Sequence, residues 1–177
     1  MNPTVCPECG SVLARDGSRN CTNPDCASLV RERIARWCAP DAMNIALSDD
    51  FIHQLVARGL LLDVADVYRL RWSELLQFKE MTEALTEALL ASIEASKSRN
   101  WCRVLYGLGI PGMDATIATL LTEKFKAVEE LAAASRVQLA AIDSVSDVVA
   151  QNVMRWFSDP QHRKLIKRLR QAGLDLG

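Results

Sequence analysis

The sequence predicts a mainly α-helical chain, in which a small four-cysteine module precedes a helical domain of four helix-hairpin-helix-like repeats. Two observations predict the helical class. Helical apolar spacing starts at Ser28, and from about Ala42 to the end Leu, Ala, Val and Ile recur at three- and four-residue intervals, while no long alternating strand pattern appears. A third observation separates the module, because residues 1–27 contain four of the six cysteines but few large apolar side chains. We therefore expect a cysteine module (1–27), a linker helix (28–41) and a helical domain (42–177).

The cysteine spacing is the strongest local signal. Cys6 and Cys9 enclose two residues, and Cys21 and Cys26 form a second pair after an eleven-residue interval. Four thiolates without an open coordination position are typical of structural Zn²⁺. Because this segment has too little apolar surface to fold alone, bound zinc would replace its missing core. The alternatives are disulfides, or a redox pair of Cys6 and Cys9, although a redox pair is expected beside a βαβ pattern that is absent here.

The helical part repeats itself around four short triplets that each have an apolar centre. They start at residues 46, 80, 112 and 144, so the steps are 34, 32 and 32 residues. A longer period of 64 residues relates Val67, Leu75 and Phe78 to Leu131, Leu139 and Ile142. Such periods indicate a repeated supersecondary unit, which we interpret as helix, tight hairpin, helix. The triplets are Ala46-Leu47-Ser48, Glu80-Met81-Thr82, Gly112-Met113-Asp114 and Ser144-Val145-Ser146.

Hairpins of this kind have a chemical use. A tight hairpin that opens a helix exposes backbone N–H groups at the positive end of that helix, which favours bound anions. Several such hairpins could follow the phosphates of a duplex without reading its sequence.

Six segments in a fixed order carry a resemblance to a known family: CPECG…CTNPDC, RERIARWCAPDAMNI, VADVYRL, LLASIEASKS, YGLGIPG and LAAIDSVSDVVAQNV. They resemble the C-terminal half of bacterial NAD-dependent DNA ligases, where a four-cysteine zinc finger precedes four helix-hairpin-helix motifs. The resemblance implies a region that binds and encircles duplex DNA without sequence specificity, while other domains carry the chemistry. No Lys-x-Asp-Gly nucleophile motif occurs, so we expect no ligation by this chain alone. The sequence leaves open an excised piece, a truncated product or a stand-alone paralogue.

The hairpins depart from the family's Gly-apolar-Gly pattern, because only Gly112 remains of eight glycines. Ser48, Thr82 and Ser146 are predicted N-caps, and carboxylates crowd the same positions, which favours the alternative that these hairpins are structural turns. The third hairpin keeps the most glycine. We therefore predict DNA contacts there, at Gly109, Ile110 and Gly112.

Positive charge collects near the C-terminus, although the chain as a whole has a net charge of −1. Residues 41–100 carry six basic and ten acidic side chains, whereas residues 101–177 carry ten and eight. Asp159 fits an N-cap, Pro160 the first helical position and Gly173 the stop of a basic helix. A solvated helix face is the alternative to phosphate binding. The predicted phosphate contacts are Arg163, Lys164, Lys167 and Arg168, with Arg31, Arg33 and Arg36 as a second candidate group.

The remaining notable side chains are expected to be structural. Cys38 and Cys102 lie in apolar helical contexts and are predicted to be buried thiols, and His53 and His162 are predicted to be ordinary helix residues. Core packing is expected for the four tryptophans, Trp37, Trp72, Trp101 and Trp156.

Two functional hypotheses remain. The first is a non-catalytic zinc module that binds double-stranded DNA, alone or with a protein partner in a repair or replication complex. The second is a ligase-like scaffold or protein-interaction module with little DNA affinity. The N-terminus lacks a signal-peptide pattern and no apolar run approaches the ~20 residues that cross a bilayer, so we expect a cytoplasmic protein without a membrane partner.

Overall fold

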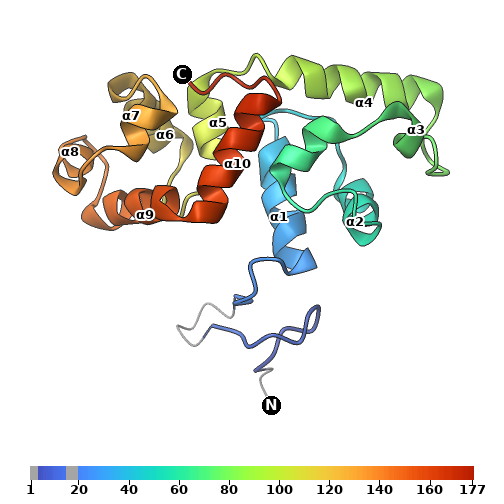
Figure 1. Cartoon of the computed structure of the whole chain (residues 1–177), viewed down its shortest axis with the longest axis horizontal. Helices are drawn as coiled ribbons and strands as arrows, with labels where there is room; N and C mark the ends of the chain where they lie inside the picture. The colour runs from blue at the N-terminus through green and yellow to red at the C-terminus, as the bar shows by residue number, and fades with distance from the viewer. Residues whose placement is uncertain (1–3, 15–19) are drawn as a thin grey trace.

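The computed structural model of the chain describes residues 4–14 and 20–177, and that part is mainly helical (Figure 1). Short helices follow one another with brief connections, as the sequence predicts. The elements are α1 (Ala27–Cys38), α2 (Asp49–Ala57), the 3-10 helix η1 (Val64–Arg69), α3 (Trp72–Leu75), α4 (Glu83–Ser96), α5 (Trp101–Gly107), α6 (Ala115–Lys124), α7 (Val128–Ala132), α8 (Arg136–Ala140), α9 (Asp147–Ser158) and α10 (Pro160–Gln171).

Four hairpins join pairs of helices that pack directly against each other. Hairpin 1 (39–48) joins α1 to α2, hairpin 2 (76–82) joins α3 to α4, hairpin 3 (108–114) joins α5 to α6, and hairpin 4 (141–146) joins α8 to α9. Each predicted triplet ends its hairpin. The predicted helix-hairpin-helix repeats are therefore confirmed.

The last residue of every triplet caps the helix that follows. The side chains of Ser48, Thr82 and Ser146 accept a hydrogen bond from the backbone N–H three residues on, at 3.2–3.3 Å. These three predicted N-caps are confirmed. The carboxylate of Asp114 does the same at 2.8 Å in hairpin 3, so a cap is common to all four hairpins.

The 64-residue period relates two halves of the helical domain. η1 and α7 begin at residues 64 and 128, α3 and α8 at 72 and 136, and α4 and α9 at 83 and 147. Four small or β-branched side chains follow the triplets at equivalent positions, and each is at most 1% exposed. They are Ile52, Thr86, Ala118 and Ala150.

The two halves share a continuous apolar core. The first helix, α1, contributes Val30, Ile34 and Trp37 to it, and the C-terminal residues Leu174 and Leu176 are also buried. Trp101 and Trp156 are buried as predicted, at 6% and 7% exposure. The division of the chain into three parts at residues 27 and 41 stays a prediction.

Trp72 corrects the expectation that all four tryptophans pack in the core. It opens α3, a helix of four residues, and its side chain is 40% exposed. A helix this short has room for only one well-buried residue, and Leu75 occupies that position.

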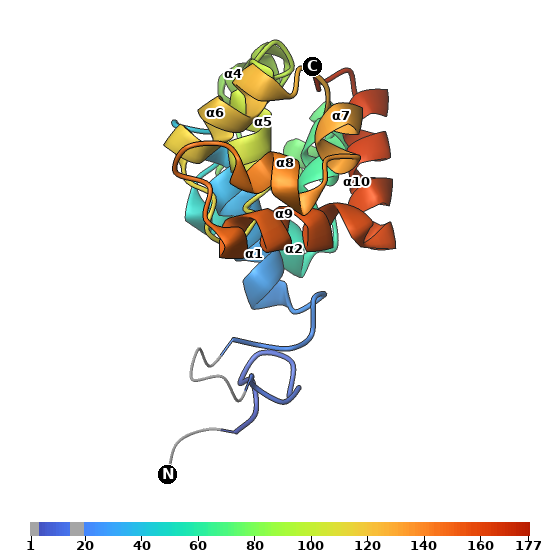
Figure 2. The same ribbon diagram turned by 90° about the vertical axis from the view of Figure 1, so that its left-hand side faces the viewer.

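The N-terminal segment lies apart from the helices, below α1 in Figures 1 and 2. Within its described residues only isolated bridges occur, between Val5 and Val12 and between Leu13 and Cys21. Few apolar side chains are buried here, which agrees with a segment that depends on a bound metal for its core.

Candidate functional site

The four cysteines of the N-terminal module converge on one point. The Sγ atoms of Cys6, Cys9, Cys21 and Cys26 all lie within 4.8 Å of one another. Cys6 and Cys26 are 3.7 Å apart, and Cys9 and Cys21 are 3.4 Å apart. Four thiolates around one tetrahedral ion at a metal–sulfur distance of about 2.3 Å would lie about 3.8 Å apart. The cluster could therefore hold a metal ion, and the distances are far longer than an S–S bond.

Local backbone geometry builds this cluster. The N–H of Gly10 donates to the carbonyl of Cys6 at 2.8 Å, and Gly10 adopts a left-handed φ of 71° that closes the turn after Cys9. Hydrogen bonds with Ser11 lower the pKa of the Cys9 thiol to about 6, whereas burial and the neighbouring thiols raise the pKa of Cys21 and Cys26, so Cys9 is the first thiolate of the metal-free cluster.

The cysteine cluster is attached firmly to the helical domain. Cys26 is the N-cap residue of α1, and its carbonyl accepts from the N–H of Val30 at 2.9 Å. Arg31 forms a 2.8 Å ion pair with Glu8, and Arg33 donates to the carbonyl of Pro24 at 2.8 Å. Two of the three arginines in the second predicted phosphate group therefore bind the module itself.

The other two cysteines have different surroundings. Cys38 is buried, and burial raises the pKa of its thiol to about 12, so it is an inert core residue as predicted. The expectation of burial is wrong for Cys102, which is half-buried near the start of α5 and donates to the Oδ1 of Asn100.

Hairpin 3 keeps the backbone shape that close approach to a phosphate requires. Gly109 and Gly112 both adopt left-handed φ angles, 68° and 79°, while Ile110 is buried at 2% exposure and anchors the loop. Gly112 is exposed, and its N–H makes no hydrogen bond with any residue that the structure describes. Of the three predicted contacts, only Gly112 offers an exposed N–H without a partner among the described residues. Gly109 is half-buried and its N–H donates to the carbonyl of Tyr106 at 3.1 Å, and Ile110 anchors the loop.

The other hairpins differ from hairpin 3 in backbone and in charge. Ser144 stands where hairpin 3 has Gly112 and keeps a left-handed φ of 68°, whereas the equivalent Ala46 and Glu80 do not adopt positive φ. Glu80 accepts a hydrogen bond from the side chain of Gln54, and Asp147 pairs with Arg136. This pairing lowers the pKa of Asp147.

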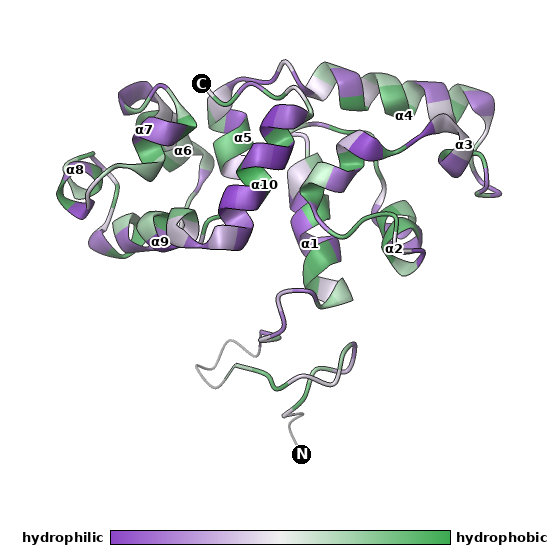
Figure 3. Cartoon of the chain, viewed as in Figure 1, coloured by the Kyte–Doolittle hydropathy of each residue, from purple (hydrophilic) through white to green (hydrophobic). Residues whose placement is uncertain are grey.

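The basic helix α10 has the predicted ends. Asp159 caps it through the N–H of Gln161 at 2.8 Å, Pro160 occupies the first turn, and Gly173 follows with φ 94°. Much of the helix surface is hydrophilic (Figure 3). Arg163, Lys164 and Lys167 are exposed and form no ion pair with the described part of the chain.

Arg168 differs from its three basic neighbours. Its guanidinium pairs with Asp63 and Asp66 of the η1 region, and its side chain is only 24% exposed. These contacts join residues that are more than 100 positions apart and tie the last helix to the first half of the domain. Since both carboxylates already neutralise this charge, Arg168 holds the fold together and is not available to a phosphate.

One contact was not visible in the sequence. The guanidinium of Arg36, at the end of α1, crosses directly over Gly109 of hairpin 3, so a Cβ at position 109 would overlap it. Both residues line a groove of about 560 Å³, together with Pro111, His162 and part of the cysteine module. The two residues are 73 positions apart, and no local pattern relates them.

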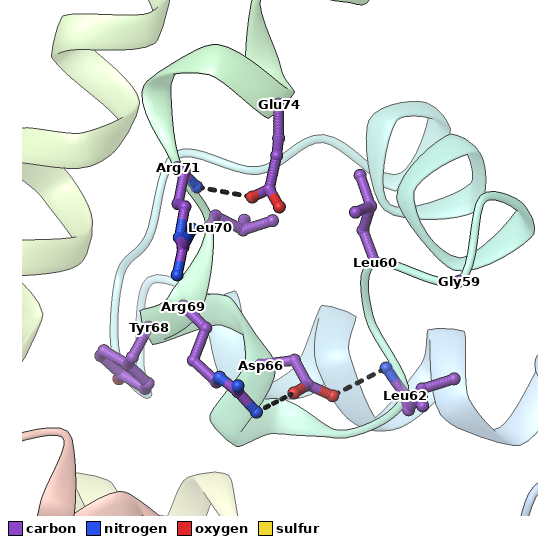
Figure 4. A pocket seen from close by; sticks show the side chains of 9 residues that line it. All are labelled: Gly59, Leu60, Leu62, Asp66, Tyr68, Arg69, Leu70, Arg71 and Glu74. Carbon is purple, nitrogen blue, oxygen red and sulfur yellow. Dashed lines mark hydrogen bonds and ion pairs between the residues drawn. The ribbon is translucent and has the colours of Figure 1, made fainter.

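A larger hollow of about 740 Å³ lies between the end of α2, η1 and α3 (Figure 4). Its carboxylates are used by the backbone: Asp66 accepts from the N–H of Leu62 at 3.0 Å, and Glu74 accepts from the N–H of Arg71 at 2.9 Å. These bonds form helix caps, which explains the acidic side chains without a ligand.

Known proteins resemble the chain over nearly its whole length. Residues 103–166, which contain hairpins 3 and 4, match a family model described as a helix-hairpin-helix motif. A DNA ligase of Synechococcus sp. (strain JA-3-3Ab) is 37% identical over 176 residues, and a DNA ligase of Shouchella clausii (strain KSM-K16) is 38% identical over 178. The alignments cover 97% and 98% of this chain. Over nearly its whole length the chain is therefore similar to one segment of these DNA ligases.

The matched segment is 26% of each of these DNA ligases, so the chain spans about a quarter of the length of the relatives it matches. The resemblance to DNA ligases that the sequence predicts is thereby confirmed.

A separate observation concerns membranes: none of the helices in residues 4–14 and 20–177 has the length and apolar character needed to span one.

Proposed function

We propose that this chain is a zinc-containing, non-catalytic module that binds the backbone of double-stranded DNA without reading its sequence. The observation that carries the proposal is hairpin 3. It combines two left-handed glycines with an exposed, unpartnered N–H, and it lies within the segment that matches the helix-hairpin-helix motif. Backbone N–H groups recognise phosphates, which are common to every DNA sequence.

The exposed charges of α10 support the same role. Arg163, Lys164 and Lys167 have no internal partners among the described residues, so each can neutralise a phosphate. Arg168 is removed from this predicted set, because Asp63 and Asp66 hold it. The proposed interface therefore comprises the backbone of hairpin 3 at Gly112 with these three side chains.

Zinc is the metal that fits the cysteine cluster best. Four soft sulfur ligands in a closed shell suit Zn²⁺ and leave no position for a reacting water. When bound, the ion would supply the cohesion that the apolar-poor segment lacks. Cys26, as the N-cap residue of α1, would pass that rigidity to the helical domain.

The test of DNA binding is fluorescence anisotropy with two labelled 20-bp duplexes of unrelated sequence at 50 and 200 mM salt. We expect equal affinity for both sequences and a steep loss of affinity at the higher salt, because phosphate contacts release counterions. Binding whose affinity does not change with salt, or that prefers one sequence, would overturn the proposal.

Metal analysis tests the zinc assignment. The purified chain should contain one zinc per molecule, and a metal-free N-terminal module that is still folded would refute the assignment.

A specific observation supports a second candidate function. All four hairpins are capped by their own side chains, and carboxylates stand at hairpins 1 and 2 where a phosphate would have to approach. The second candidate is a ligase-like scaffold that binds a protein and has little DNA affinity. Absence of duplex binding at 50 mM salt would favour it over the first.

A further inference from the structure

The groove between the cysteine module, hairpin 3 and α10 contains features that backbone binding to a duplex does not use. Its volume of about 560 Å³ lies within the ~300–1,000 Å³ of small-ligand sites. Its lining includes a cation on a close-approach glycine and an aromatic side chain on the opposite element, α10. These are the two kinds of group that recognise a nucleotide.

The aromatic side is a stacked pair. The ring of His162 lies parallel to that of Trp156, with centroids 4.2 Å apart and an interplanar angle of 6°. The Nδ1 of His162 lies 3.0 Å from the carbonyl oxygen of Trp156, which can only accept, so Nδ1 carries the proton. Trp156 is buried and covers one face of the imidazole, while His162 is half-buried and lines the groove. The ring is thus held in place against Trp156 on one face, and it lines the groove.

The cationic side is Arg36. Its side chain is 42% exposed, and its ion pair is with Glu32 on the same helix, which is itself 64% exposed. Such an exposed pair is weak and exchanges readily for a phosphate. Because the guanidinium crosses Gly109, a phosphate bound to Arg36 would lie beside hairpin 3, although the N–H of Gly109 itself donates to the carbonyl of Tyr106.

Two of the three carboxylates that line the groove are engaged by other groups. Asp63 is neutralised by Arg168, and Asp159 accepts from the N–H of Gln161 as the cap of α10. Asp25, in the cysteine module, is exposed, and Arg33 of α1 also lines the groove.

We infer that this groove holds one unpaired nucleotide of a DNA strand, with its phosphate at Arg36 and Gly109 and its base stacked on His162. The inference rests on the proposed DNA binding and adds a preference for duplexes that carry a single-stranded tail. Stacking on an aromatic ring tolerates any base, so the preference is independent of sequence.

The experiment compares three labelled DNAs that share one duplex: blunt, with a three-nucleotide tail, and with a three-nucleotide abasic tail that keeps its phosphates. Both tail polarities are measured. We expect the tailed duplex of one polarity to bind about tenfold more tightly than the blunt duplex, since one stacked base contributes this order of affinity. The abasic tail should lose most of the gain.

Three variants locate the effect. His162→Ala should abolish the tail preference and leave blunt-duplex affinity unchanged, whereas His162→Phe keeps a planar ring and should retain it. Arg36→Ala should weaken binding of the tailed and abasic DNAs together. Lys79→Ala, on the exposed surface of hairpin 2, serves as the matched control and should change nothing.

The outcomes separate this inference from the proposed function. Tight blunt-duplex binding with no gain from either tail overturns the groove assignment alone, as does a tail preference that survives His162→Ala. Binding of the tailed DNA without any binding of the blunt duplex supports the groove and refutes the duplex proposal. Absence of binding to all three DNAs refutes both.

Discussion

The two halves of the helical domain share one architecture, but their hairpins differ in backbone conformation and in charge. In the second half, Gly112 and Ser144 keep the left-handed backbone at the first position of the triplet, and in the first half Ala46 and Glu80 do not. The first half is also the acidic part of the chain, and the second half carries the exposed basic side chains of α10. A fold can therefore keep its caps and core in both halves while only one half keeps features that suit a polyanion.

The largest expected effect tests the charge difference between the halves. Replacement of Arg163, Lys164 and Lys167 with Ala should lower duplex affinity by about a hundredfold at 150 mM salt. The slope of log affinity against log salt should also decrease by up to about 0.9 per lost contact, because each residue neutralises a phosphate. The matched control removes three exposed basic residues of the first half, Arg69, Arg71 and Lys79. Equal losses in both triple variants, measured by anisotropy, would contradict the assignment of DNA contact to the second half.

The next effect tests the ion pairs that join the halves. Arg168→Ala leaves Asp63 and Asp66 without their partner in a partly buried site, so we expect about 2 kcal/mol of lost stability. Arg170→Ala removes a more exposed pair with Glu129 and should cost less than about 1 kcal/mol. Urea unfolding of both variants gives the comparison, and similar losses would show that the Arg168 contacts do not stabilise the domain.

Hairpins 3 and 4 offer a smaller, paired test of backbone shape. Gly112→Ala introduces a Cβ at φ 79° and 3.0 Å from Val149, so it should destabilise the domain by about 1 kcal/mol or more and weaken DNA binding. Ser144→Gly removes the same left-handed strain in hairpin 4 and should stabilise by about 0.5–1 kcal/mol. Thermal unfolding measures the stability of both variants. A loss of stability in Ser144→Gly would contradict the view that residue 144 has the same strained left-handed backbone as residue 112.

The smallest predicted effect concerns equivalent positions on α4 and α9. Thr86 and Ala150 are 64 residues apart and both fully buried, but the hydroxyl of Thr86 has no hydrogen-bond partner in the described structure. Thr86→Val keeps the volume and removes an unsatisfied polar atom, so it should stabilise by about 1 kcal/mol. Ala150→Thr is the reciprocal change and should destabilise by a similar amount or more. The prediction fails if urea unfolding shows that Thr86→Val lowers stability.

Much of the architecture could be predicted from the sequence because it is encoded locally. Caps such as Ser48 and Ser146 depend on a hydrogen bond that spans three residues, and the spacing of the cysteine pairs predicts the cluster that they form. The 64-residue period also gave the correct correspondence between η1 and α7, because repeated units bury equivalent positions.

The parts that sequence did not reveal depend on distant partners. Arg168 belongs to a basic run and resembles its neighbours, yet Asp63 and Asp66 lie more than 100 residues away and determine its role. The stacking of His162 on Trp156, and the approach of Arg36 to Gly109, likewise arise only when helices pack. Trp72 is exposed because α3 is too short to bury it, and helix length was not evident from the apolar spacing.

The most direct test of the account is to observe which half of the domain meets DNA. Backbone amide NMR of the zinc-loaded chain, titrated with a 20-bp duplex, should show its largest shifts at residues 109–115 and 163–167. Hairpins 1 and 2, at residues 39–48 and 76–82, should change little. Equal shifts in all four hairpins, or shifts confined to the first half, would contradict the central claim that only the second half retains a surface for the DNA backbone.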